Sequence, residues 1–335
     1  MIIIRPIRKD DADAFVNLVL TRGKGMTSLP KDSRKLHQLI DDSLEAFSLG
    51  CSEPVPYIYL FVMENTATQE LIGTCGIKGK GMKPRYYYLM EQEKRIFPSG
   101  IEHSLPLIRP VSYPNTPTEI CALYLEKDWR KSGLGKLLSL SRFLFIATFR
   151  SGFTDKIIAE LRGYINGNGL YVFWEKVGRV FYNVSRDDAV AISLTEPEKT
   201  PRLLPNHPIY VDLLDPEARL VLSQTHEQTR AARDILSREG FSFSREVDII
   251  DAGPKYQAAT DSIHSIKESV RQQVTSIGHL GNQYPFAMIS NQNIDFRVCI
   301  GSLYIDTSGN LSIPSEVSLA LKVEVGDYVR YTIQS

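Results

Sequence analysis

The residues whose types and spacing most clearly suggest a chemical function lie at positions 130–135, where the chain reads Arg-Lys-Ser-Gly-Leu-Gly. Gly133 and Gly135 remove side chains at the point where a helix is expected to begin. Free backbone N–H groups at a helix start, reinforced by the helix dipole, form an anion site that suits a pyrophosphate. Arg130 and Lys131 add positive charge beside it. This spacing therefore predicts a phosphate-binding turn made by these four residues.

The turn lies between an expected strand and an expected helix. Residues 120–125 are apolar on both faces, as in a strand that is buried on both sides. From Leu134 onward the apolar spacing becomes helical and gives a wide apolar face. Its members are Leu137, Leu138, Leu140, Phe143, Leu144 and Ala147. Strand, glycine turn and amphipathic helix in this order favour a phosphate-binding turn over an ordinary one.

His226 also suggests a chemical function, because an imidazole with an ordinary pKa of about 6.5 can exchange a proton near neutral pH. The pattern Thr-His-Glu-Gln at 225–228 indicates a helix start, with Thr225 as the N-cap and Gln228 at the third helical position. The helix dipole there lowers the pKa of a histidine and favours the neutral imidazole. From the residues alone, a solvated or capping role is the simpler interpretation.

The composition is that of an ordinary globular protein and excludes several classes. The 335 residues suffice for a sizeable core and two domains. Lys+Arg and Asp+Glu both number 39, so no overall positive charge is available to hold nucleic acid. No apolar run approaches the ~20 residues of a membrane span, and the N-terminus lacks a signal-peptide pattern. We therefore expect a cytoplasmic protein that acts on small molecules, without nucleic acid or membrane partners.

Neither the cysteines nor the histidines indicate a metal site. Cys51, Cys75, Cys121 and Cys299 are scattered without metal-type spacing, so reduced thiols in a cytosol are the simplest interpretation. The six histidines show no pairing at ligand spacing with cysteines or carboxylates. We expect no metal.

Up to residue 200 the predicted order of elements is β-α-α-β-β-β-α-β-α. The expected strands are residues 2–6, 57–63, 71–77, 119–125 and 156–161, and the expected helices are residues 12–19, 36–47, 134–147 and 168–177. Residues 82–117 are rich in Tyr, Pro and charge, and we interpret them as a long irregular insertion. Residues 1–200 are expected to form one domain.

Beyond residue 200 the pattern changes, and residues 201–335 are expected to form a C-terminal extension. Its expected helices are residues 216–222, 225–239 and 261–274, and a strand is expected at residues 241–250. Gly240 is the expected C′ residue that closes the second of these helices. From residue 285 the chain reads as short strands with turns, which indicates a small β-sheet or barrel.

The loop pattern R-x-x-G-x-G between a strand and a helix resembles the acyl-CoA pyrophosphate loop of the GCN5-related N-acyltransferase superfamily, and the order of elements is similar too. From residue 2 to residue 335, separated segments resemble a narrower family, the bacterial arginine N-succinyltransferases. These segments include Ile4-Arg5-Pro6, the loop at 25–30, Cys121-Ala122-Leu123-Tyr124-Leu125, Asp128-Trp129-Arg130-Lys131, His207-Pro208-Ile209-Tyr210, Glu239-Gly240-Phe241 and Asp251-Ala252-Gly253-Pro254.

The resemblance implies an α+β, GCN5-related acyltransferase fold. In that fold a mixed β-sheet flanked by helices splays apart, here between residues 119–125 and 157–161, and the thioester lies in the gap. The resemblance makes residues 1–200 the acyl-CoA-binding domain. It makes residues 201–335 an α/β extension that contributes the catalytic histidine and ends in the small β-rich subdomain.

The resemblance also implies a reaction, the transfer of a succinyl group from succinyl-CoA to the α-amino group of L-arginine, or of ornithine in some members. This reaction begins an ammonia-producing pathway of arginine catabolism. The family's strand leucine that meets the acyl-CoA falls on Leu123, and its proton donor falls on His226. A strand backbone at Leu123 can bond the pantetheine arm as an added strand would, with an N–H facing the thioester oxygen. Succinyl-CoA is the implied co-substrate, no metal is implied, and the family suggests a homo- or hetero-oligomer.

Both substrates carry charged groups that the site must recognise. The succinyl carboxylate needs cations or amides; candidates by position are Arg22, Lys24 and residues 27–28. The guanidinium of arginine needs carboxylates or aromatic faces; candidates are Glu119, Glu160 and the tyrosines at 86–88. For each candidate a structural role is an equally open interpretation.

The chain departs from the family's pattern in three places, one of which is the segment at residues 82–117, which is only loosely similar. Ala252 stands where relatives tend to read Gly, and residues 266–270 are less basic than in relatives. Two alternatives therefore stay open. The first is an acyltransferase with another acyl donor or with ornithine or another amine as acceptor. The second is a CoA-binding module without turnover, and replacement of His226 would separate it from an enzyme.

Overall fold

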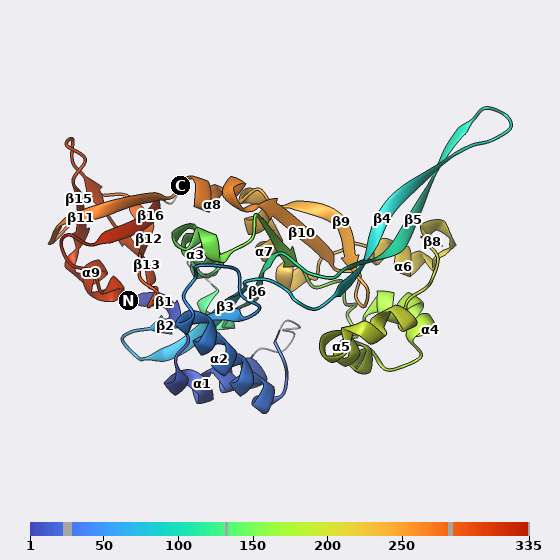
Figure 1. Ribbon diagram of the computed structural model, residues 1–335, viewed down its shortest axis with the longest axis horizontal. Helices are drawn as coiled ribbons and strands as arrows, with labels where there is room; N and C mark the ends of the chain where they lie inside the picture. Colours follow the sequence, from blue (N-terminus) through green and yellow to red (C-terminus); the bar gives the residue numbers. More distant parts are fainter. Residues whose placement is uncertain (23–28, 131–132, 281–283, 334–335) are drawn as a thin grey trace. The chain divides into compact units, whose positions relative to one another are not determined.

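The computed structural model of the protein describes residues 1–22, 29–130, 133–280 and 284–333 (Figure 1). The chain forms two compact units. The first comprises Met1–Lys80, Thr118–Asp155 and Ala259–Ser335, and the second comprises Gly81–Pro117 and Lys156–Ala258. Each unit draws on residues from both sides of position 200, the domain boundary expected from the sequence. The roles assigned to residues 1–200 and 201–335 stay predictions.

The strands of the first unit lie in the order β14-β15-β11-β16-β12-β13-β1-β2-β3-β6. Their bounds are Ile2–Pro6 (β1), Ile58–Asn65 (β2), Glu70–Lys78 (β3), Thr118–Leu125 (β6), Val270–Gly278 (β11), Phe286–Asn291 (β12), Val298–Ser302 (β13), Tyr304–Ile305 (β14), Leu311–Pro314 (β15) and Tyr328–Ile333 (β16). Strand β11 pairs in parallel with β15 and antiparallel with β16. The sheet is therefore mixed, as predicted.

Helices cover both faces of the central strands of the first unit. Its helices are α1 (Ala12–Asn17), α2 (Ser33–Ser48), α3 (Leu134–Thr148), α8 (His264–Lys267) and α9 (Ser315–Leu321), with short helical turns at Lys9–Asp11, Leu18–Arg22, Lys127–Trp129, Arg150–Gly152 and Thr260–Ser262. Leu60 and Val62 of β2 belong to the apolar cluster of α1 and α2. Phe61 contacts Phe145 of α3, with ring centroids 5.0 Å apart. Because successive strand side chains point to opposite faces, β2 is covered on both sides.

The small β-sheet predicted near the C-terminus is confirmed. Strands β11 to β16 and helix α9 enclose an apolar cluster that includes Ile289, Leu311 and Val329. The helix predicted at residues 261–274 is wrong beyond α8, because β11 begins at Val270 and pairs with β16. Val274 of β11 is fully buried in that cluster, so tertiary pairing overrides the weak helical pattern here.

The strands of the second unit lie in the order β7-β10-β9-β4-β5-β8. Their bounds are Arg85–Ile96 (β4), Glu102–Tyr113 (β5), Lys156–Glu160 (β7), Ile209–Tyr210 (β8), Ser242–Asp248 (β9) and Pro254–Ala259 (β10). The helices are α4 (Arg179–Tyr182), α5 (Arg186–Thr195), α6 (Pro216–Val221) and α7 (Glu227–Arg238), with short helical segments at Trp174–Gly178, Pro197–Leu203 and Val211–Leu213. Throughout the described ranges, none of the helices has the length and hydropathy of a bilayer-spanning segment.

Residues 82–117 are not the irregular insertion that we expected. They form a long hairpin of β4 and β5, which Figure 1 shows projecting at one end of the second unit. Gly100 has a φ of 79° and donates to the carbonyl of Phe97 over 2.8 Å, which closes the turn. Ion pairs across the strands, such as Lys94 with Glu102 at 2.7 Å, account for the high charge. The prolines of β5 concealed the strand pattern, since proline is rare inside strands.

Two helix boundaries can be compared with the turn residues from which they were predicted, the start of the helix expected at residues 168–177 and the end of α7. The helix expected at residues 168–177 begins later, because the side chain of Asn166 accepts from the N–H of Asn168 and holds that segment in a turn. Gly240 is the C′ residue of α7, as predicted, with a φ of 94°. The N–H of Phe241 reaches back to the carbonyl of Leu236 over 3.0 Å, which completes the helix end.

Candidate active site

Strand β6 carries a β-bulge beside Leu123, the residue expected to meet acyl-CoA. The register between β3 and β6 shifts between Thr74 and Gly76, so Ala122 and Leu123 together face a single residue of β3. Ala122 is buried and has a φ of 52°, in the left-handed region that residues with a Cβ rarely adopt. A bulge leaves one residue outside the regular ladder and re-aims its neighbours. Leu123 is half-buried and lies at this irregularity.

The predicted phosphate-binding turn follows β6 and leads into α3. Gly133 is the N-cap of α3, with a φ of 78° that favours glycine. No side chain among the described residues caps this helix, so its first N–H groups are available to a ligand. Arg130 Nε donates to the carbonyl of Leu125 over 2.9 Å, and its guanidinium lies 5.9 Å from the centre of the Tyr124 ring. Lys131 lies outside the described residues.

Gly133 and Gly135 differ in the structural reason for having glycine at each position. A Cβ on Gly135 would approach only Leu125, at an ordinary contact distance of 3.9 Å. A Cβ on Gly133 would meet nothing within 4 Å, but the backbone there is left-handed. Gly133 is therefore explained by conformation, whereas nothing in the described packing around Gly135 requires glycine. Among the described residues only Leu125 comes near that position, so the space there can accept a bound group.

Most candidates for binding the substrate charges are engaged or undescribed. Glu119 forms a 2.9 Å ion pair with Lys78. Glu160 pairs with Arg85 and accepts a 2.5 Å hydrogen bond from the hydroxyl of Tyr87. The structure does not describe Lys24, residues 27–28 or the side chain of Arg22. A guanidinium already occupies the carboxylate of Glu160, so any role of Glu160 toward a substrate needs that pair to open.

His226 lies in the second unit and is itself the N-cap of α7. Its Nδ1 accepts a hydrogen bond from the backbone N–H of Gln228 at 3.1 Å. Thr225, the predicted N-cap, instead forms an isolated β-bridge with Gly163. The backbone N–H of His226 donates to the carbonyl of Arg162 over 2.9 Å. The predicted cap was wrong by one residue, because the imidazole takes the capping role that a hydroxyl usually has.

The surroundings hold His226 in one neutral form. Burial lowers its pKa below the ordinary value, and the nearby positive charge of Arg162 lowers this pKa further. Because Nδ1 accepts from the N–H of Gln228, the proton of the neutral ring is on Nε2. Protonation of Nδ1 would break the helix cap. In this geometry His226 offers an Nε2–H donor rather than a free lone pair.

A buried carboxylate that we did not predict joins the segments around His226. Asp251 accepts from the backbone N–H of Gly163 at 3.0 Å and from that of Gly253 at 2.8 Å. A Cβ on Gly163 would lie 2.0 Å from the carbonyl oxygen of Asp251, so only glycine fits there. Arg162, whose carbonyl holds His226, directly precedes Gly163. Asp251 was visible in the sequence as part of a resembling motif, but without a role.

A second carboxylate, the partly buried Asp248, lies three residues before Asp251. Its Oδ1 accepts from the backbone N–H groups of Ile250 and Asp251, at 2.7 Å and 3.0 Å. Burial raises the pKa of Asp248, and the negative charges of Asp251 and Glu160 raise it further. Burial also raises the pKa of Asp251, against its two backbone donors. The two acids raise one another's cost of ionisation, so the pKa of Asp248 rises to about 7.

Family models cover almost the whole chain. The model for "Arginine N-succinyltransferase beta subunit" matches residues 2–265, and that for its C-terminal domain matches residues 271–332. The chain belongs to the arginine N-succinyltransferase family. It is 33% identical to the arginine N-succinyltransferase of Enterobacter sp. (strain 638) over 339 residues, which cover 98% of this chain and 97% of that one. Over 338 residues it is 33% identical to that of Escherichia coli (strain 55989 / EAEC), with the same coverage.

A solved structure from the arginine N-succinyltransferase family agrees with the fold. It is the arginine/ornithine succinyltransferase subunit AI from Pseudomonas aeruginosa, with a TM-score of 0.87 and 28% identity. The match covers 99% of this chain and 98% of that chain. The predicted α+β fold class, a mixed sheet flanked by helices, is confirmed.

The structure explains the departure from the arginine N-succinyltransferase pattern at Ala252. Ala252 has a φ of 55°, a conformation that glycine adopts without strain. Its side chain is fully buried in the apolar cluster of the second unit, and its carbonyl accepts from the N–H of Ser223 over 3.1 Å. The alanine therefore adds one methyl group to the core, while the backbone takes the path expected of glycine.

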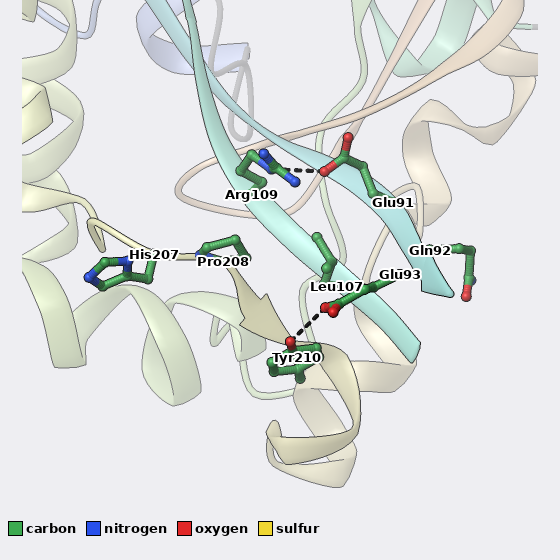
Figure 2. Close-up of a pocket in the computed structure, with 8 residues that line it drawn as sticks. All are labelled: Glu91, Gln92, Glu93, Leu107, Arg109, His207, Pro208 and Tyr210. Carbon is green, nitrogen blue, oxygen red and sulfur yellow. Dashed lines mark hydrogen bonds and ion pairs between the residues drawn. The ribbon is translucent and has the colours of Figure 1, made fainter. Parts of the chain in front are cut away.

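One cavity of about 490 Å³ lies between β4, β5 and β8 of the second unit (Figure 2). Glu91 and Arg109 form a 2.9 Å ion pair at its wall, and the hydroxyl of Tyr210 donates to Glu93 over 2.6 Å. His207 lies at the same opening. None of the residues predicted for catalysis or CoA binding lines this cavity.

The two glycines of the turn should respond differently to alanine. Gly133→Ala should lower the free energy of unfolding by about 1–2 kcal/mol, because alanine is strained at a φ of 78°. Gly135→Ala should leave it unchanged or raise it by up to about 1 kcal/mol, because alanine favours a helix and its Cβ fits. Urea unfolding of both variants checks this. Equal destabilisation would contradict the described turn.

The buried acids should make stability fall as the pH rises. The pKa of Asp248 is raised to about 7 in the folded state, while its unfolded pKa is near 3.8. Its contribution is therefore full below pH 3.8 and is lost as the pH rises through the folded pKa. Asp248→Asn cannot ionise and keeps an oxygen acceptor. Relative to wild type it should gain on the order of 1–3 kcal/mol of unfolding free energy between pH 4 and pH 8.

Urea unfolding across that pH range measures the gain. The matched control is Asp41→Asn, at an exposed position of α2. The control should run parallel to wild type at every pH. A parallel curve for Asp248→Asn as well would show that Asp248 is ionised in the folded protein.

Proposed function

We propose that this chain is an arginine N-succinyltransferase, which transfers the succinyl group of succinyl-CoA to the α-amino group of L-arginine. Similarity along nearly the whole chain to proteins of that name carries the proposal. The reaction would begin arginine catabolism by the succinyltransferase pathway. Ornithine is a second candidate acceptor, because the solved relative is named an arginine/ornithine succinyltransferase.

The proposed acyl-CoA contacts lie in the first unit. The open N–H groups at the start of α3 suit the pyrophosphate, with Gly133 and Gly135 giving access and Arg130 and Lys131 supplying charge. The backbone at Leu123 suits the pantetheine arm as an added strand would. Because the bulge leaves a peptide outside the regular ladder, it can supply a donor to the thioester oxygen.

The chemistry is a direct transfer without an acyl-enzyme. The α-ammonium of arginine first loses a proton, and the free amine then attacks the thioester carbon. The C–N bond forms, the carbonyl oxygen gains negative charge, and the attacking nitrogen becomes positively charged. The oxyanion then collapses and the C–S bond breaks, while the nitrogen gives up its second proton to leave a neutral amide. The CoA thiolate takes up one proton, so that one proton in total is released to solvent. Donors aimed at the oxygen or at the leaving sulfur stabilise these charges.

His226 is proposed to act as a neutral hydrogen-bond donor through Nε2. Its Nδ1 is occupied by the N–H of Gln228, so Nε2 bears the proton and has no lone pair with which to act as a base. Its lowered pKa keeps the ring neutral. A neutral imidazole at a helix N-terminus can polarise a developing oxyanion without giving up its proton. This differs from the acid role that the family resemblance implies.

We also propose that the chain works in an oligomer within the cytoplasm. The matching family model and the solved relative are both described as subunits. Cys51, Cys75, Cys121 and Cys299 are all buried and unpaired with one another, which suits a reducing compartment.

The deciding experiment is release of the CoA thiol from succinyl-CoA, with and without L-arginine. L-ornithine and acetyl-CoA provide the parallel arms. Arginine-dependent release that is specific to succinyl-CoA is the expected result. Release with ornithine alone would change the acceptor. Binding of CoA without release from any pair would overturn the enzyme and favour a binding module.

The turn assignment predicts a selective loss of CoA affinity in Gly135→Asp. The carboxylate would stand against the pyrophosphate in the space that is now open beside Gly135. The Kd for CoA, measured by calorimetry, should rise at least tenfold, whereas Gly135→Ala should change it less. An unchanged Kd in the aspartate variant would remove the turn from the CoA site.

Substitutions at His226 can separate its capping role from its chemistry. Asparagine is a strong N-cap, so His226→Asn should keep the wild-type Tm, whereas His226→Ala should lose about 1 kcal/mol. Both should lower kcat at least tenfold with little change in the Kd for CoA. Wild-type turnover in His226→Asn would exclude the imidazole from the reaction. NMR of the ring nitrogens should show the Nε2–H form and a pKa below 6.5.

A further inference from the structure

Arg142 is a buried cation without a carboxylate partner. It lies in the middle of α3, and its residue is only 3% exposed. Its Nε and Nη2 donate to the carbonyl and the hydroxyl of Ser139, at 3.0 Å and 2.9 Å. Its Nη1 donates to the carbonyl of Cys121 at 3.4 Å. Within the described ranges no carboxylate lies at ion-pair distance from it.

The groups around Arg142 do not neutralise its charge. Burial raises the pKa of the Cys75 thiol to about 11 and that of the Cys121 thiol to about 12, so both are neutral. Burial also lowers the pKa of Arg142, but an arginine stays protonated in proteins. Burying an unpaired charge is costly, and an apolar side chain of similar volume is commonly at least as stable. Packing alone therefore does not explain an arginine at this position.

The contact of Arg142 with β6 lies at the bulge. The Cys121 carbonyl that accepts from Nη1 belongs to the peptide that leads into Ala122, whose φ is 52°. At 3.4 Å this hydrogen bond is long, but its donor is charged and it meets the peptide directly before the strained residue of the bulge. Backbone strain of this kind persists only where the surrounding structure determines it. The peptide of Leu123 follows directly.

We propose that Arg142 is a positioning residue for acyl transfer, which fixes the Ala122 bulge and thereby the orientation of the Leu123 peptide. The inference rests on the proposed function, in which that peptide faces the thioester. The positive charge of Arg142 also lies beside β6, the strand at which the thioester carbonyl oxygen would become negative during the reaction. Arg142 touches neither substrate in this account. Arg142 should affect turnover far more than CoA affinity, because it contacts β6 from the middle of α3, whereas the phosphate-binding turn is at the N-terminus of that helix.

The test compares Arg142→Met and Arg142→Lys with Leu144→Met, a volume-conserving change on the same helix. Arg142→Met should keep the wild-type Tm or exceed it, change the Kd for CoA less than twofold and lower kcat at least tenfold. Arg142→Lys keeps the charge but not the fork of donors, and should give an intermediate kcat. Leu144→Met should leave kcat within twofold of wild type.

Amide hydrogen exchange supplies a readout that does not depend on activity. Exchange at Leu123 should be at least tenfold faster in Arg142→Met, while exchange at the amides of β2 stays unchanged. Wild-type exchange at Leu123 together with wild-type kcat, in Arg142→Met or, if that variant does not fold, in Arg142→Lys, would overturn the inference. An inactive wild-type protein would instead refute the proposed function and leave the exchange result to decide on the bulge.

Discussion

The burial of α3 is the constraint on which the first unit depends. Residues 137–146 of this helix are all buried, so it is enclosed on every side along that stretch. Strand β2 supplies Phe61 against Phe145, while α1 and α2 cover its other face. Once α3 is fixed in this way, its N-terminus can only follow the end of β6. The glycine turn is thus positioned by packing some distance away from it.

In the second unit the segments around His226 are positioned by close backbone contacts, whereas in the first unit a buried helix positions the turn. Gly163 has no room for a side chain against Asp251, and the Asp251 carboxylate bonds two backbone N–H groups. The carbonyl of Arg162 then holds the backbone of His226. Three segments that lie far apart in the sequence are joined by hydrogen bonds to the main chain. The acids themselves are not exposed to react, so their role is to hold this arrangement.

Both candidate regions store backbone strain in alanine. Ala122 and Ala252 each have a positive φ and are buried, in a conformation that costs an alanine about 1–2 kcal/mol. Ala122 lies at the bulge next to Leu123. Ala252 lies between Asp251, whose carboxylate bonds the N–H of Gly163, and Gly253, which directly precedes β10. Strain of this kind is concentrated at functional sites. Here the surrounding hydrogen bonds of Arg142 and Asp251 maintain it.

The sequence by itself determined the central strand and helix α3, because apolar period is a local property. The family followed from the resemblance of separated segments to the arginine N-succinyltransferases. The sequence placed Gly133 at the start of α3 and Gly240 as the residue that ends α7, since glycine is common where a helix end needs a positive φ. The binding role of Gly133 stays a prediction. Only the tertiary structure decided that residues 82–117 are a hairpin, since its prolines and charges are tolerated through pairing across the strands. It alone showed the bulge at Ala122 and the lone charge of Arg142, and it made His226 the cap in place of Thr225. These features depend on which distant backbone groups meet, and no spacing along the chain encodes that.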